Sequence, residues 1–194
     1  MSRTRTAMVL ASVALAVLLA LPGASRPDAA SPALVLAEGV PRDVGDLAWA
    51  TWIRFVDAFP ARRSCLDPVT VAAAPKLDDR ATYDPDRRLV TVRIPATAPA
   101  LEASFVHEFA HHLEFTCADH ETLRPSFLGA QGHSQDDSWF GGATWEETPS
   151  EQFAEATSSL VLGRRHSHFP IAIADRAVAV IRAWAHDERL KHRP

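Results

Sequence analysis

The chain has 194 residues and a formal net charge of −4 at pH 7, with 20 Lys and Arg against 24 Asp and Glu. This length predicts one domain with a single sizeable core. The slightly acidic balance, with no dominant basic face, argues against a nucleic-acid partner.

The N-terminus has the layout of a secretory signal. Arg3 and Arg5 precede an apolar run over 7–21, and small residues follow it up to Ser25. The run is about 15 residues long, which is shorter than the ~20 that a membrane-spanning helix needs. We therefore expect residues 1–25 to be a signal peptide and the mature protein to be secreted, without stable membrane insertion. A retained N-terminal anchor is the alternative.

The chain contains two cysteines, Cys65 and Cys117. In an exported protein, a small even number of cysteines predicts a disulfide bond, here between these two. Two free buried thiols are the alternative.

The first half of the chain predicts a helix and two strands after a linker. Residues 26–41 are rich in Pro, Ala and Ser and indicate a flexible linker, so the folded domain would span 42–194. The apolar spacing over 43–59 predicts an amphipathic helix. Two runs rich in Val, Thr and Ile, at 68–74 and 88–95, predict strands.

Turn residues between these strands predict an antiparallel pair, and further helices follow. A helix over 97–116 carries one apolar face, so we expect an α+β fold, mostly helical, with a small antiparallel sheet packed on that helix. Residues 118–147 predict mostly loop, with a short helix near 124–130. Two more helices are predicted over 148–163 and 170–190.

The helix over 97–116 carries the pattern H-E-x-x-H as His107, Glu108 and His111. Histidines four positions apart lie one turn apart on one helix face, where two imidazoles can share a zinc ion. Glu108, next to the first ligand, can accept a proton from a metal-bound water. A solvated polar face with chance spacing is the alternative.

Zinc held by two histidines and a water lacks one ligand. Glu151 and Glu155 lie one turn apart on the helix over 148–163, so one of them can ligate the metal while the other hydrogen-bonds a ligating imidazole. Glu151 also fits a capping box with Thr148, in which it would turn back to the helix N-terminus. The remaining candidate donors are Glu146, Glu147 and His133.

The sequence indicates less specific roles for two other polar residues of the 97–116 helix. Glu114 lies on the side of the imidazoles one turn beyond His111, where we expect it to contact an arginine or solvent; assistance to the imidazoles is the alternative. His112 lies beside the apolar stripe and is predicted to be a structural histidine.

The pairing of H-E-x-x-H with a glutamate on a later helix resembles the gluzincin zinc peptidases, and the run over 151–155 is close to that of lethal factor-like members. The chain also resembles uncharacterised exported zincin-like proteins of actinobacteria. This resemblance implies a zincin-like metallopeptidase domain with one zinc ion. It implies that Glu151 is the third ligand and that Glu155 supports an imidazole. By the same analogy, the strand over 88–95 would border the cleft and pair with an extended peptide.

The resulting hypothesis is a secreted zinc-dependent peptidase that acts on a peptide or protein substrate, with Glu108 as the general base for a zinc-activated water. An amidase acting on cell-wall peptide would show the same pattern. The alternative from another class is a non-enzymatic exported binding module that zinc stabilises. The candidates to stabilise the oxyanion are Tyr83, His133, His166 and His168, but none of them matches a family motif, so this role has no assigned residue.

Overall fold

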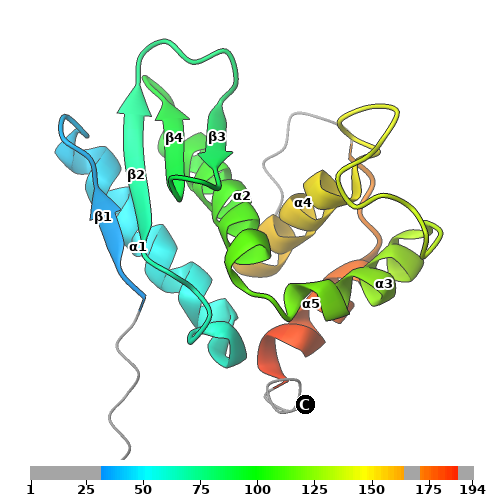
Figure 1. Cartoon of the computed structure of the whole chain (residues 1–194). Helices are drawn as coiled ribbons and strands as arrows, with labels where there is room; N and C mark the ends of the chain where they lie inside the picture. Colours follow the sequence, from blue (N-terminus) through cyan, green and yellow to red (C-terminus); the bar gives the residue numbers. More distant parts are fainter. Residues whose placement is uncertain (1–31, 164–170, 188–194) are drawn as a thin grey trace, which may run out of the picture.

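The computed structural model of the chain describes residues 32–163 and 171–187 (Figure 1). These residues form an α+β fold. Its helices are α1 (Arg42–Ala58), the 3-10 turn η1 (Pro60–Arg62), α2 (Ala98–Thr116), α3 (His120–Gln131), α4 (Pro149–Leu162) and α5 (Asp175–His186). Its strands are β1 (Leu34–Leu36), β2 (Val69–Ala74), β3 (Ala81–Asp84) and β4 (Leu89–Arg93). The predicted signal peptide lies outside the described residues.

The four strands form one mixed sheet in the order β1-β2-β4-β3. Strands β1, β2 and β4 are parallel, with Val71 opposite Val90, and β3 runs antiparallel to β4. The prediction of an antiparallel sheet is therefore wrong for β2 and β4. The chain passes over the end of β4 to form β3 first, within the segment predicted as a turn, and β4 then inserts between β2 and β3 (Figure 1).

Strand β1 lies inside the segment predicted as a linker. It pairs with β2 through Val35 and Thr70, and its Leu34 side chain is buried. The Trp52 indole of α1 donates a hydrogen bond to the carbonyl of Pro32 at 2.8 Å. These contacts join the start of the described chain to the sheet and to α1.

Helix α2 lies at the centre of the molecule, between the sheet with α1 and the helix α4 (Figure 1). Its predicted apolar face is confirmed, because Phe105, Phe109 and Leu113 are fully buried. The Phe109 ring packs edge-on against Trp52 of α1, with ring centroids 4.8 Å apart. This packing fixes the rotation of α2 and turns its opposite, histidine-bearing face toward α4.

The predicted disulfide between Cys65 and Cys117 is confirmed, with the Cα atoms 5.0 Å apart. It fastens the end of α2 to the segment between η1 and β2. The side chain of Arg62 is fully buried beside it and donates hydrogen bonds to the Asp119 carboxylate at 2.5 Å and to the Trp184 carbonyl at 2.6 Å. These bonds tie α5 and the start of α3 to the same end of α2.

Helix α3 corrects the prediction that residues 118–147 are mostly loop. It has 12 residues and contains Pro125, whose ring disfavours the interior of a helix. Leu123, Phe127 and Leu128 lie at helical spacing on its buried face, and that burial outweighs the proline. Among the described residues, no helix is long and apolar enough to cross a membrane.

Candidate metal centre

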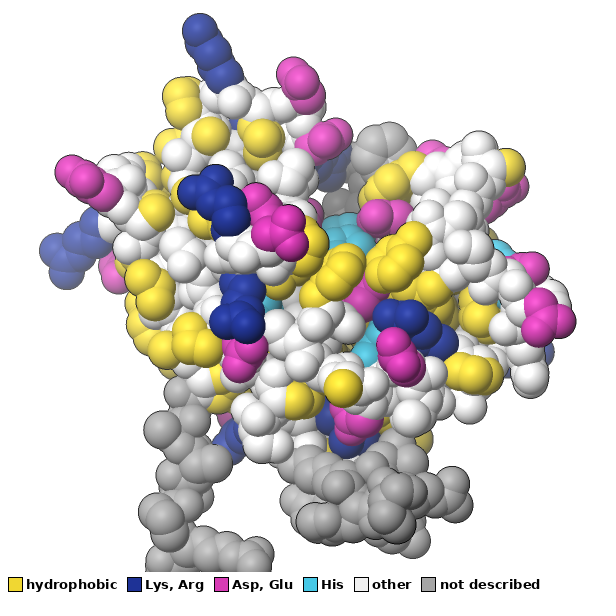
Figure 2. All heavy atoms as spheres, in the orientation of Figure 1, with side chains coloured by type: hydrophobic (Ala, Val, Ile, Leu, Met, Phe, Trp, Pro, Cys, Tyr) yellow, Lys and Arg dark blue, Asp and Glu magenta, His cyan; other side chains and the backbone are white. Residues whose placement is uncertain are grey.

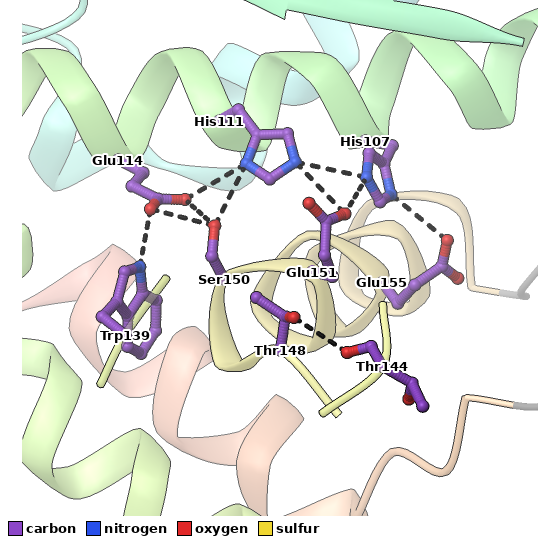
Figure 3. A network of polar contacts seen from close by, with 9 residues as sticks. All are labelled: His107, His111, Glu114, Trp139, Thr144, Thr148, Ser150, Glu151 and Glu155. Carbon is purple, nitrogen blue, oxygen red and sulfur yellow. Dashed lines mark hydrogen bonds and ion pairs between the residues drawn. The ribbon is translucent and has the colours of Figure 1, made fainter. Parts of the chain in front are cut away.

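The two histidines of the H-E-x-x-H pattern lie together on the face of α2 that meets α4 (Figure 3). The Nε2 atoms of His107 and His111 are 3.2 Å apart. Their side chains are only 13% and 12% exposed, so both rings are largely shielded from water. The structure therefore brings these predicted residues together as the helical spacing requires.

Glu151 from the first turn of α4 completes a group of three donors, which we call the metal group. Its Oε2 atom lies 3.0 Å from Nε2 of His107 and 3.5 Å from Nε2 of His111. Donors held about 2.0–2.1 Å from a tetrahedral zinc are separated from one another by about 3.3 Å. The three separations of 3.0, 3.2 and 3.5 Å match this spacing, so the residues fit a single small cation.

The alternative capping-box role of Glu151 is not adopted. The backbone N–H of Thr148 instead donates to the Trp145 carbonyl at 3.1 Å. The Thr148 hydroxyl donates to the Thr144 carbonyl at 3.0 Å and makes no side-chain cap (Figure 3). Glu151 is therefore left to face the two imidazoles.

Each imidazole of the metal group has a carboxylate behind it. Nδ1 of His107 lies 3.2 Å from Glu155 Oε1, and Nδ1 of His111 lies 3.2 Å from Glu114 Oε2. An Nδ1–H that donates to a carboxylate fixes the tautomer, which leaves the Nε2 lone pair free for a metal. Both Nε2 atoms accordingly point into the same space.

The prediction that Glu114 contacts an arginine or solvent is wrong. Its side chain is fully buried and accepts hydrogen bonds from the Trp139 indole at 2.6 Å and from the Ser150 hydroxyl at 3.0 Å (Figure 3). Its position one turn beyond His111 was visible in the sequence. The approach of Trp139 and Ser150 was not, because it depends on how α4 and its preceding loop fold against α2.

The carboxylates around the metal group favour the protonated form of both imidazoles. Burial alone would lower the pKa of both histidines, but hydrogen bonds to Glu151 and to the carboxylate behind each ring raise the pKa of His107 to about 9 and that of His111 to about 10. Burial would raise the pKa of Glu151, but the two imidazoles hold it well below its ordinary value. A bound cation would replace those protons, so metal binding releases protons here.

Glu108 lies beside His107 on α2, is 7% exposed and lines the cavity above the metal group. Burial raises its pKa, and the nearby imidazoles oppose that shift. A buried carboxyl with a raised pKa holds a proton more readily than an exposed one, which suits a group that takes a proton and returns it.

The cavity has a volume of about 700 Å³. Its floor follows α2 from Ala103 to Phe115, one wall is β3, and the other wall is α4 with part of the preceding loop. Figure 2 shows histidine side chains at the bottom of this hollow, with hydrophobic and acidic side chains around them. Strand β3, and not the predicted 88–95 strand, is the sheet edge beside the cavity, because β4 is enclosed between β2 and β3.

Tyr83 of β3 also lines the cavity, but its hydroxyl group donates its hydrogen bond to His112. His112 is fully buried and donates from Nε2 to the Asp67 carbonyl at 2.9 Å, so its Nδ1 accepts from Tyr83 at 2.9 Å. Burial lowers the pKa of His112 to about 4, which keeps the ring neutral. His112 is thus structural, as predicted, and Tyr83 holds the sheet edge against α2.

His133 lies outside the metal group. It pairs with the side-chain oxygen of Gln152 at 2.7 Å. His166 and His168 lie outside the described residues. Two aromatic rings of the loop before α4 line the cavity. Trp145 stacks on His107, and Phe140 stacks on Phe115.

Comparisons with protein-family models, with curated proteins and with solved structures found no match for this chain. We therefore infer its function from the side chains of the cavity. Among the described residues, one other group, Cys65, Cys117 and Asp119, is close enough to hold a metal. Both of its sulfur atoms are joined in the disulfide, which leaves the metal group on α2 and α4 as the candidate centre.

Proposed function

We propose that the protein is a secreted zinc-dependent peptidase with a zincin-like domain, in which His107, His111 and Glu151 hold one zinc ion. The observation that carries this proposal is the separation of the three donor atoms, 3.0–3.5 Å, with a carboxylate behind each imidazole. The N-terminal sequence pattern supports secretion.

The donor set favours zinc over harder cations. Two imidazoles and one carboxylate are typical of catalytic zinc sites, in which three protein ligands leave one position open. When bound, zinc in such a site supplies a Lewis acid that lowers the pKa of a water and polarises a carbonyl.

Glu108 is the proton carrier in this proposal. It takes a proton from the water whose oxygen attacks the carbonyl carbon of the peptide bond. It then gives that proton to the leaving nitrogen as the C–N bond breaks. Its buried position beside His107 and its raised pKa suit both steps.

The sheet edge indicates why the substrate would be a peptide. Among the described residues, β3 pairs on one side with β4, and its other side borders the cavity. An extended peptide can add to such an edge through backbone hydrogen bonds. This arrangement would lay the peptide along β3, above the metal group.

The test combines zinc content with turnover of a broad peptide library by the wild type, by Glu108→Gln and by Glu121→Gln. Glu121 is an exposed residue in the first turn of α3 and serves as the control. We expect one zinc ion in all three proteins, and hydrolysis by the wild type and Glu121→Gln only. A wild type that holds one zinc and hydrolyses no peptide would refute the peptidase and support a zinc-stabilised binding module.

A further inference from the structure

Exposed aromatic side chains gather in the cavity that contains the metal group. Phe115, Phe140 and Trp145 are 50%, 55% and 39% exposed, and all three line this cavity. Large apolar side chains that stay accessible together, with polar residues around them, usually mark a binding site. Because these rings are accessible, a ligand in the cavity can contact them directly.

Two of these rings and a tyrosine form a row at one end of the cavity, which we call the aromatic shelf. The Phe115 ring stacks on Phe140 with the centroids 5.5 Å apart, and its centroid lies 6.0 Å from that of the Tyr83 ring. The three rings belong to α2, to the loop before α4 and to β3, so the shelf includes the floor and both walls of the cavity. Toward the N-terminal end of α2, the lining consists of the small side chains of Ala103 and Ser104.

The shelf lies in the direction in which a peptide paired with β3 would run. Strand β3 lies beside α2 (Figure 1). Asp79, two residues before β3, is close enough to Glu108 to add to the effect of burial in raising the pKa of that carboxyl. Tyr83, four residues later, contacts Phe115. A peptide that extends the sheet at β3 would therefore follow α2 from the metal group to the shelf.

The separation between the metal group and the shelf predicts which substrate residue the shelf contacts. Phe115 follows His107 by eight residues and His111 by four, so it lies about 9 Å along the helix axis from the middle of this pair. An extended peptide advances about 3.3 Å per residue. The shelf is therefore level with a side chain about three residues from a carbonyl held at the metal group.

We propose that the aromatic shelf binds an aromatic side chain of the substrate peptide, at a fixed distance from the cleaved bond and on one side of it. This proposal rests on the proposed peptidase function. Accessible rings favour another ring through offset stacking or edge-on contact, and removal of its apolar surface from water adds to the affinity. The metal group would select a carbonyl, and the shelf would select which carbonyl along the chain is presented.

Digestion of a positional peptide series by the wild type tests this inference. Each decapeptide contains one phenylalanine in a background of serine and alanine, and the phenylalanine moves by one position from peptide to peptide. We expect the cleaved bond, located by mass spectrometry, to move with the phenylalanine at a constant offset of about three residues, always on the same side. Replacement of the phenylalanine by serine should lower kcat/KM by about ten- to a hundredfold, as for the burial of one aromatic side chain.

Substitutions of exposed apolar residues inside and outside the cavity form a matched set. Phe115→Ala and Phe140→Ala should each lower the ratio of kcat/KM for the phenylalanine peptide to that for its serine counterpart. Ile53→Ala should leave this ratio unchanged, because Ile53 is 56% exposed on α1, outside the cavity. Cleavage at bonds that do not move with the phenylalanine, or a ratio that neither phenylalanine substitution lowers, would overturn the proposal.

A binding measurement separates this inference from the proposed function. Zinc-loaded Glu108→Gln protein is titrated by calorimetry with the phenylalanine peptides and their serine counterparts, with and without Phe115→Ala. Cleavage by the wild type without a preference for phenylalanine would refute the shelf and leave the peptidase intact. Selective binding that depends on Phe115, with no cleavage of any peptide, would refute the peptidase and support the shelf as a site for aromatic side chains. Neither cleavage nor selective binding would refute both.

Discussion

Replacing Glu114 with glutamine should weaken zinc binding by the metal group without creating a cavity. Three donors face the Glu114 carboxylate, namely the Trp139 indole, the Ser150 hydroxyl and Nδ1 of His111. A glutamine has one accepting oxygen and must turn its NH₂ group toward one of these donors. If the amide donates to His111 Nδ1, the ring proton moves to Nε2 and blocks metal ligation.

The size of this effect follows from two features of Glu114. Partners that orient a ligating imidazole typically change metal affinity by about 10- to 100-fold, which is about 1.4–2.7 kcal/mol. Hydrogen bonds to a charged acceptor exceed neutral ones by about 1 kcal/mol each. The gain from no longer burying a charge offsets part of that loss, so we expect the free energy of unfolding of the metal-free protein to fall by about 1–3 kcal/mol.

The assay is a zinc titration against a chromophoric chelator, paired with urea unfolding of the metal-free protein. Glu121→Gln is the control, since it removes the same charge from an exposed position on α3, and it should leave zinc affinity unchanged. The reasoning would be refuted if Glu114→Gln bound zinc as tightly as the wild type while its unfolding free energy fell. Glu114 would then support the packing of Trp139 and not the orientation of His111.

Three further predictions follow from named contacts. Glu151→Ala should weaken zinc binding by more than the roughly 10- to 100-fold expected of Glu155→Ala, because Glu151 faces both Nε2 atoms and Glu155 only an Nδ1; equal losses in the chelator titration would contradict the assignment. The double change Cys65→Ser, Cys117→Ser should lower the unfolding free energy by about 4 kcal/mol, because the disulfide closes a loop with a separation of 52 residues, and an unchanged urea midpoint would count against it. Burial lowers the pKa of His120 to about 4. Between pH 6.5 and 4 the unfolded chain therefore binds a proton that the folded chain does not, and the free energy of unfolding decreases as the pH is lowered. In His120→Phe, this decrease should be smaller by up to about 3 kcal/mol. Identical profiles of unfolding free energy against pH for the two proteins would exclude this contribution.

The local elements of the fold could be predicted from the sequence more readily than the sheet. The apolar spacing of α1 and α2 gave these helices to within a few residues, because each buries one continuous face. Strands β2 and β4 were also found, but their relative direction was wrong. Two strands separated by turn residues are typical of a hairpin, so an antiparallel pair was predicted. The short strand β3 lies between them in the sequence and reverses the chain direction, so β4 runs parallel to β2. Its Thr82 is exposed, which left it without a clear apolar pattern.

The metal group could be predicted as a set of alternatives because its members lie on two helices with their own periodicity. His107 and His111 share a face of α2, and Glu151 and Glu155 share a face of α4, whatever the fold. The sequence does not contain the offset between the two helices. A shift of α4 by one turn would bring Glu155 to the Nε2 atoms and remove Glu151 from them.

The packing of α4 sets this offset. Phe153, two positions beyond Glu151, is fully buried and packs edge-on against His120 and Phe127 of α3. Ala154 and Ala156 are also fully buried, and such small side chains let α4 approach α2 closely. A helix held by a ring on α3 cannot slide by a turn without opening a large cavity, which costs several kcal/mol. The choice of Glu151 over Glu155 at the Nε2 atoms is therefore made in the apolar core, by residues that never touch the metal group.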